Sequence, residues 1–170
     1  MSHEVNRDLL KALAEGYGVA LDFWDFDGNF REVSTSTLIS VLAAMGVDAS
    51  SDESIRAELK ARDERPWRRV LPHCTIARDD RETTFQVHVP HGCSVQVEII
   101  VEGGGTIGAR QIDDWELPRD IDGVLTGQAS FVVPVGTPLG YHKLRARVMD
   151  GGEDRVEEAS LCLLYTSPSP

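Results

Sequence analysis

Hydrophobic residues in the first third of the chain recur every three or four positions, the spacing that forms one face of an α-helix. The pattern predicts three helices, within residues 6–18, 34–46 and 51–65. Each follows a residue whose side chain can cap a helix, namely Asn6, Ser34 or Ser36, and Ser51 or Asp52. Glycines at positions 16 or 18 and 46 end the first two helices, and Pro66 ends the third.

The stretch between the first two predicted helices is VALDFWDFDGNFREV, residues 19–33, and it is rich in aromatic and turn-forming residues. Asp27 and Gly28 can make a tight turn. The pattern therefore predicts two short extended pieces joined by that turn.

After WRRVLP, residues 67–72, the hydrophobic period changes to two, as in β-strands. In residues 83–90, Phe85, Val87 and Val89 share one face, and His88 lies on the polar face. Residues 94–102 alternate in the same way, so the two runs are predicted to be adjacent antiparallel strands joined at PHGC, residues 90–93. Further predicted strands are residues 108–117, 127–135, 142–150 and 156–164.

The predicted fold class is α+β, a helical N-terminal subdomain over residues 1–66 followed by an antiparallel immunoglobulin-like β-sandwich over residues 67–164. Residues 165–170, YTSPSP, break with the preceding composition. A native Ser/Pro linker is one interpretation. We favour another, a non-native or disordered tail, because LLYTSPSP resembles translated sequencing-adapter sequence. If that interpretation holds, the chain is expected to be a fragment whose native sequence differs after about residues 161–164.

The run GTPLGYHKLRARV, residues 136–148, places a turn directly before a strand. Pro138 and Gly140 supply the turn, and Tyr141 is predicted to be a tyrosine corner whose hydroxyl binds neighbouring backbone. The strand's inward face is predicted to hold Leu144, Ala146 and Val148, and its outward face Lys143, Arg145 and Arg147.

The composition and net charge of the chain disfavour several classes of function. The chain has 170 residues, 41% hydrophobic and 26% charged, with a net charge of −11. This charge disfavours nucleic acid and anionic membranes as partners, and Arg68-Arg69 is a short basic group only. No run reaches the ~18 apolar residues of a membrane span, and no signal pattern begins the chain. With three scattered cysteines, Cys74, Cys93 and Cys162, these features predict a cytoplasmic protein with reduced thiols.

Candidate chemistry is sparse. His73, Cys74, His88, His91 and Cys93 are close in sequence, but their spacing matches no zinc pattern, so surface histidines are expected rather than a metal site. His73 and Cys74, as strand neighbours, would point to opposite faces and not form a catalytic pair.

Two carboxylate pairs, Asp25 with Asp27 and Asp113 with Asp114, are better explained as turn residues than as catalytic acids across a cleft. GGGTIG, residues 103–108, lacks the Lys-Ser/Thr of a phosphate loop and is predicted to be a hairpin turn.

Three tryptophans, Trp24, Trp67 and Trp115, could stack on sugar rings, although packing in a core or interface is the commoner role of tryptophan. No catalytic, cofactor-binding or metal-ligating residue is predicted, and no cofactor.

Four stretches, taken in order, resemble one family. They are residues 9–48, LLKALAEGYGVALDFWDFDGNFREVSTSTLISVLAAMGVD, then RPWRRVLP, VHVPHG and PLGYHKL. Together they resemble the N-terminal region of actinobacterial 4-alpha-glucanotransferases, the amylomaltase or disproportionating enzymes of the MalQ family. The resemblance extends from Leu9 to about Leu161, and it rests on the order of the motifs.

The resemblance implies that this chain precedes a catalytic barrel that transfers 1,4-α-glucan segments between maltodextrins by a retaining, two-step mechanism. The family's catalytic carboxylates lie on that barrel, so no catalytic position transfers to this sequence, and the chain is expected to be inactive alone. Its expected partners are the barrel of the same chain and maltodextrin. The expected role is to pack on the barrel or shape glucan access. The alternative is a free-standing carbohydrate-binding or protein-interaction β-sandwich module.

Overall fold

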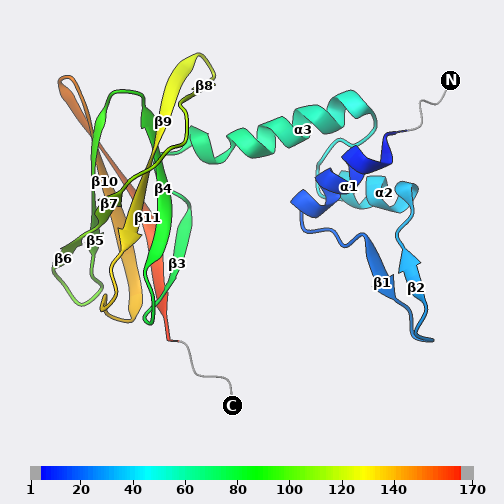
Figure 1. The fold of residues 1–170 in the computed structure, drawn as a ribbon, viewed down its shortest axis with the longest axis horizontal. Coiled ribbons are helices and arrows are strands. Elements are labelled where there is room, and N and C mark those ends of the chain that lie inside the picture. The colour runs from blue at the N-terminus through cyan, green and yellow to red at the C-terminus, as the bar shows by residue number, and fades with distance from the viewer. Residues whose placement is uncertain (1–4, 166–170) are drawn as a thin grey trace. The chain divides into compact units, whose positions relative to one another are not determined.

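A computed structural model describes residues 5–165 of the chain (Figure 1). The chain divides into two compact units, the first ending at Glu64 and the second starting at Arg65. The residues of the predicted tail after Tyr165 lie outside the described part. The predicted α+β class, helices followed by a β-sandwich, is confirmed.

Between residues 5 and 64, the first unit contains three helices and one short β-hairpin. The elements are α1 (Arg7–Gly16), β1 (Asp22–Trp24), β2 (Phe30–Glu32), α2 (Thr35–Ala44) and α3 (Asp52–Glu64). The predicted N-caps are confirmed: the Asn6 side chain accepts hydrogen bonds from the Asp8 and Leu9 amides, and Ser34 Oγ accepts one from the Thr37 amide. Ser51 Oγ accepts in the same way from the Ser54 amide at the start of α3.

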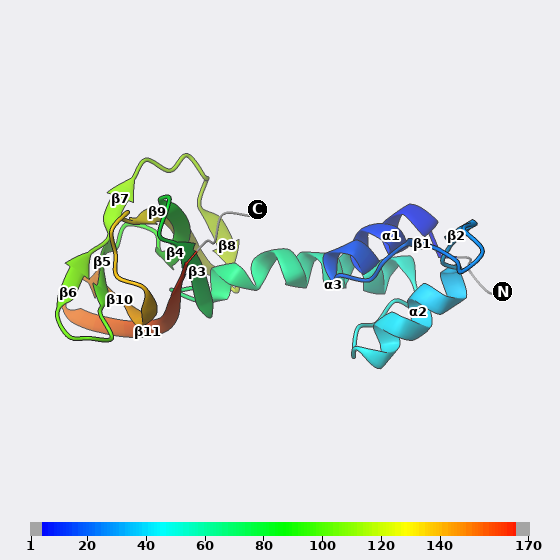
Figure 2. The same ribbon diagram turned by 90° about the horizontal axis from the view of Figure 1, so that it is seen from below.

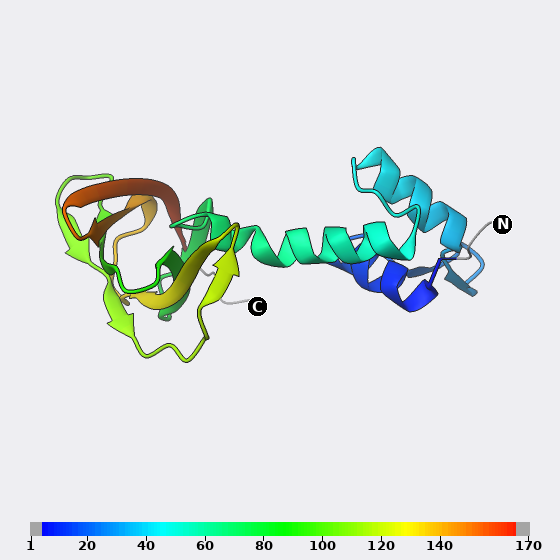
Figure 3. The same cartoon turned by 90° about the horizontal axis from the view of Figure 1, so that it is seen from above.

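The apolar faces of the three helices meet in one core. Figure 3 shows the ribbons of α1 and α2 beside the N-terminal part of α3. Because α3 contributes Ile55 and the half-buried Leu59, its N-terminal part packs into this core. The buried residues are Leu10, Leu13, Ala14, Leu38, Leu42, Val47, Ala49 and Ile55.

The second unit begins with a short 3-10 helix, η1 (Pro66–Arg68), and continues in strands. One sheet has the order β3-β11-β10-β5-β6, and the other has β4-β9-β7 with β8 paired to β9. All pairs are antiparallel except β3 with β11. The strands are β3 (Cys74–Arg78), β4 (Thr83–Pro90), β5 (Ser94–Ile100), β6 (Thr106–Gly108), β7 (Arg110–Ile112), β8 (Arg119–Ile121), β9 (Val124–Val133), β10 (Gly140–Asp150) and β11 (Glu153–Leu164).

The two sheets face each other across a hydrophobic core, as Figure 2 shows for β10 and β11 against β4 and β9. The predicted inward face of β10 is confirmed, with Leu144 and Ala146 fully buried. The same alternation buries Phe85 and Val87 on β4 and Ile99 on β5. The period of two therefore identified which side of each strand faces the core.

The predicted pairing of the strand at residues 83–90 with the strand at 94–102 is wrong. β4 pairs with β9, and β5 pairs with β10 and β6, so these consecutive strands lie in opposite sheets. The turn at Pro90–Cys93, with Gly92 at a φ of 93°, carries the chain from one sheet to the other. Alternation gives a strand's buried face but not its partner, and both faces of a sandwich core produce the same pattern.

The predicted tyrosine corner is also wrong. Tyr141 is 74% exposed, and its hydroxyl has no hydrogen-bond partner within residues 5–165. The next residue fixes the corner: His142 is buried, its Nε2 donates to the Pro138 carbonyl at 2.6 Å, and its Nδ1 accepts from the Glu102 amide at 3.1 Å. The Glu102 carboxylate also accepts from the Tyr141 amide at 2.9 Å.

Candidate functional site

The most exposed aromatic group of the first unit is the hairpin formed by β1 and β2, which we call the aromatic hairpin, residues 22–32. Trp24 pairs directly across from Phe30, and their ring centroids lie 5.6 Å apart at an angle of 68°. Trp24 is 71% exposed, and Phe26, in the turn, is fully exposed. Phe23 and Phe30 are each about half exposed. Figure 1 shows that the hairpin projects from α1 and α2.

The turn of the aromatic hairpin is organised by Asp25. Its carboxylate accepts hydrogen bonds from the Asn29 amide at 2.8 Å, the Asp27 amide at 3.1 Å and Arg31 Nε at 2.9 Å. The bond from the Asn29 amide, followed by that from Arg31, lowers the pKa of Asp25. The prediction that Asp25 and Asp27 serve turn formation is confirmed, since Asp25 is held as a carboxylate inside the loop.

An ion pair connects the hairpin to the first helix. Arg7 Nη2 lies 2.9 Å from Glu32 Oε2, and the Val33 amide donates to the Leu21 carbonyl at 2.8 Å. These contacts hold both ends of the hairpin. The exposed rings are therefore presented on a constrained piece of backbone rather than on an open loop.

Trp67 has the opposite environment. It is only 6% exposed, its ring centroid lies 4.5 Å from that of His88, and the Arg119 guanidinium lies 4.5 Å from the ring centroid on one side. The predicted surface position of His88 is wrong, because only 7% of this residue is exposed. It does lie on the outer face of its sheet, but Trp67 covers that face.

His88 belongs to a buried polar junction on the sheet formed by β4 and β9. Its Nε2 lies 3.0 Å from Gln128 Oε1, and Gln128 Nε2 donates to Asp114 Oδ2 at 3.0 Å. Ser130 Oγ donates to the same oxygen at 2.6 Å. Burial lowers the pKa of His88, although the contacts with Gln128 and Asp114 oppose this.

Asp114 ties the segment between β7 and β8 to this junction. Desolvation raises the pKa of Asp114, but the hydrogen bonds from Ser130, the Glu116 amide and Gln128 outweigh it, so the pKa lies below its ordinary value. Asp113 is exposed. The two neighbours thus have different environments, and the bond from the Glu116 amide to Asp114 is of the kind found in turns.

Trp115 lies on the same segment and is 89% exposed, with Leu117 beside it in sequence at 78%. The sequence analysis treated the three tryptophans alike, but the structure separates them by their exposure to solvent. Trp67 is a buried packing residue, and Trp24 and Trp115 remain candidates for contact with a ligand.

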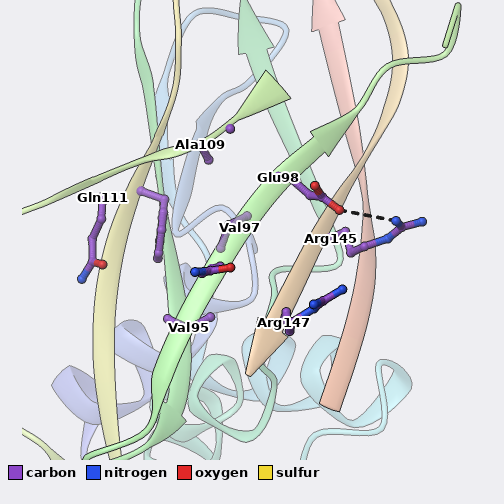
Figure 4. Close-up of a pocket in the computed structure, with 10 residues that line it drawn as sticks. Val95, Val97, Glu98, Ala109, Gln111, Arg145 and Arg147 are labelled. Carbon is purple, nitrogen blue, oxygen red and sulfur yellow. Dashed lines mark hydrogen bonds and ion pairs between the residues drawn. The ribbon is translucent and has the colours of Figure 1, made fainter. Parts of the chain in front are cut away.

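A hollow of about 520 Å³ opens at the flank of the sandwich, between β5 of one sheet and β7 of the other (Figure 4). Its size falls within the range of small-molecule pockets. Val95 and Val97 contribute apolar surface, and Glu98 and Arg145 form an ion pair at 3.4 Å on its wall. Arg145 also pairs with Glu158 at 2.9 Å, so the predicted basic row on β10 is largely neutralised by acidic neighbours.

The histidines and cysteines that were weighed as metal ligands or nucleophiles form no metal site in the described part of the chain. Within residues 5–165, no group of three or more His, Cys, Asp or Glu side chains is placed to hold a metal ion. His73 Nδ1 lies 2.8 Å from Arg69 Nη1, and Cys74 is exposed. The glycines at 103–105 join β5 to its antiparallel partner β6, so the predicted hairpin turn is confirmed. No helix of the described part is long and apolar enough to cross a membrane.

Sequence reasoning singled out Trp24 but not the phenylalanines around it. Their signal was present, because aromatic residues flank the Asp-Gly turn on both sides in DFWDFDGNF. The residues of the hollow, such as Gln96 and Gln111, gave no signal. Gly108 and Ala109 line the hollow where the chain changes sheets between β6 and β7, and alternation does not report such a crossing.

Comparisons with known proteins give consistent results. The sequence model of the family described as "MalQ N-terminal beta sandwich domain" matches residues 70–165. The 4-alpha-glucanotransferases of Mycobacterium tuberculosis and Mycobacterium bovis are each 37% identical over 142 residues, which cover 83% of this chain and 20% of theirs. The chain therefore spans about a fifth of the length of these relatives.

Among solved structures, the amylomaltase of Corynebacterium glutamicum matches with a TM-score of 0.86 and 34% sequence identity. The match covers 94% of this chain and 23% of that one.

Proposed function

The chain belongs to the MalQ N-terminal β-sandwich domain family, and on this basis we propose that it is the N-terminal accessory region of a 4-alpha-glucanotransferase. The proposal rests on how much of each chain the structural match with the amylomaltase covers. Nearly all of this chain, 94%, corresponds to only 23% of an amylomaltase, at a TM-score of 0.86. A region that matches so completely to a small part of a longer enzyme is best explained as one of its domains.

The parent reaction would transfer 1,4-α-glucan segments between maltodextrins with catalytic groups that lie outside this chain. A retaining transfer needs a carboxylate nucleophile and a carboxylic acid whose pKa is raised so that it can donate a proton. Asp25 and Asp114, the best hydrogen-bonded acids of the two carboxylate pairs, have lowered pKa values and accept hydrogen bonds from neighbouring backbone and side chains. Both are suited to holding loops and poorly suited to donating protons.

The accessory role that we propose is to pack on the catalytic part and to shape the access of long glucans. The exposed rings of Trp24 and Trp115 support it, because large aromatic surfaces left open on a folded domain mark contact sites. The hollow beside β5 is a weaker candidate, since the ion pair of Glu98 with Arg145 already satisfies charges on its wall.

The experiment compares the purified chain with the complete glucanotransferase in one assay. Both are incubated with maltotriose, and glucose and longer dextrins are measured. The proposal predicts glucose release by the complete enzyme and none by the chain alone. Turnover by the 170-residue chain would show that it holds its own catalytic groups and would overturn the proposal.

A second candidate function is a free-standing carbohydrate-binding or interaction module. The same exposed tryptophans favour it, because a module of this kind must present its ligand surface without help from another domain. Sequencing the locus beyond codon 161 separates the two. A reading frame that continues into transferase sequence supports the accessory region, and one that ends near codon 165 supports the module.

A further inference from the structure

We propose that the aromatic hairpin, residues 22–32, is a binding platform for α-1,4-glucan, with Trp24 and Phe30 as the rings on which the sugar packs. The ligand class rests on the proposed function, and the site itself rests on the geometry of the hairpin. Pyranose rings present faces of C–H groups, which pack favourably on the electron-rich faces of aromatic side chains. The hairpin presents such faces to solvent.

The arrangement of the rings favours a curved glucan. Trp24 and Phe30 are cross-strand partners, so their side chains lie on the same side of the hairpin. Their rings are inclined by 68° and do not form a flat surface. An α-1,4-glucan turns from one glucose to the next and can place successive units on inclined rings. A flat β-1,4-glucan needs rings that lie in one plane.

The polar groups around the rings suit a neutral ligand with many hydroxyls. The carboxylates of Asp22 and Asp27 have no hydrogen-bond or ion-pair partner among the described residues, and each can accept from a sugar hydroxyl. Residues 22–32 carry more acidic than basic side chains. This charge repels nucleic acid and anionic membranes, so the exposed rings are not suited to those partners.

The hairpin is also fixed before any ligand binds. Asp25 holds the turn through the Asn29 amide and Arg31, and Glu32 is held by Arg7 of α1. A constrained platform loses little conformational entropy on binding. Exposed rings on such a support are therefore positioned for contact.

The test is a titration of the 170-residue chain with maltoheptaose, followed by NMR of the tryptophan indole signals. We expect the Trp24 signal to shift with a dissociation constant of about 1 mM or tighter, and cellohexaose to bind more weakly. Trp24→Ala should weaken maltoheptaose binding by about tenfold or more. Phe26→Ala should weaken it less, since Phe26 lies in the turn beyond the ring pair.

Tyr141→Ala is the matched control, because Tyr141 is 74% exposed, close to the 71% of Trp24, but lies on β10 of the sandwich. Its binding curve should match that of the unchanged chain. The inference is overturned if maltoheptaose shifts no hairpin signal, or if the Trp24 and Tyr141 variants lose binding equally. It is also overturned if Trp24→Ala leaves binding unchanged, which would favour a protein surface as the occupant of the hairpin. None of these results depends on whether the complete enzyme transfers glucan, so each proposal can fail separately.

Discussion

The aromatic hairpin of the first unit and the buried polar junction of the sandwich contain the same kinds of residue in opposite environments. Each has a tryptophan, a second ring and an aspartate that accepts several hydrogen bonds. Trp24 is 71% exposed, whereas Trp67 is 6% exposed. The difference comes from what lies over each ring. Arg119 and the segment that Asp114 holds enclose the junction, whereas among residues 5–64 the ring of Trp24 stays mostly open to solvent.

This contrast indicates that the residues of the junction stabilise the fold, whereas the exposed residues of the hairpin serve binding. In the junction, each polar group has a partner inside the fold, so its removal should cost stability. In the hairpin, the rings and two carboxylates are free to contact a ligand, so their removal should leave the fold intact. The predictions below test this division, beginning with the largest expected effect.

Trp67→Ala should lower the free energy of unfolding of the sandwich by about 3–5 kcal/mol, because it opens a cavity and exposes His88. Urea denaturation measures the change. The matched control is Trp115→Ala, whose effect should stay within about 0.5 kcal/mol because the ring is exposed. Equal effects of the two substitutions would contradict the assignment of Trp67 to the core.

His142→Ala should lower the free energy of unfolding by about 2–4 kcal/mol, because it leaves the Glu102 amide and the Pro138 carbonyl without their partner. Tyr141→Phe, at the adjacent position, should change it by less than about 0.5 kcal/mol. Thermal melts of the two variants measure which substitution destabilises the fold more. A larger loss in the tyrosine variant would restore the tyrosine corner.

The junction should also make the sandwich sensitive to mild acid. The folded pKa of His88 is depressed by burial below its ordinary value of 6.5, so the unfolded chain takes up a proton at a higher pH than the folded one. The contribution of neutral His88 to the free energy of unfolding is fully present above pH 6.5. It is lost as the pH falls from 6.5 toward the folded pKa. The pKa of Asp114 is lowered from 3.8, so this group changes its protonation state, and with it the stability of the fold, only in more acidic solution.

Urea midpoints at about pH 7.5 and 5.5, on either side of the ordinary histidine pKa, measure this effect. The midpoint of the unchanged chain should fall more between these values than that of His88→Gln, which keeps a polar side chain at the position. A variant with the same pH dependence as the unchanged chain would exclude His88 as the source.

Trp24→Ala should have the smallest effect on stability, within about 0.5 kcal/mol, because its ring is mostly in solvent. A thermal melt of the variant checks this directly. A clear loss of stability would mean that the ring supports the fold of the first unit, and the contrast between the two regions would then fail.

The sequence predicted the elements better than it predicted their neighbours. The helix caps Asn6 and Ser34 were recognisable because capping depends on residues within one turn of each other. The partner of β4 was not, because pairing with β9 depends on residues about 40 positions away. His88 was assigned to the correct face, but its burial depends on Trp67 and on the segment that Asp114 holds.

The corner before β10 shows a signal that was present but not used. Leu144, Ala146 and Val148 define the inward face, and a step of two back from Leu144 reaches His142, not Tyr141. Alternation alone would therefore have placed the histidine inside. The hollow beside β5 is different, because no local pattern reports where a chain crosses between sheets.

One measurement tests most directly whether this region serves a glucanotransferase through its aromatic hairpin. In the complete enzyme, the rate of transfer from long amylose is divided by the rate from maltotriose, with and without the Trp24→Ala substitution. We predict that the ratio falls by about threefold or more in the variant, because a second contact raises the effective concentration of a long glucan only. An unchanged ratio would contradict the account.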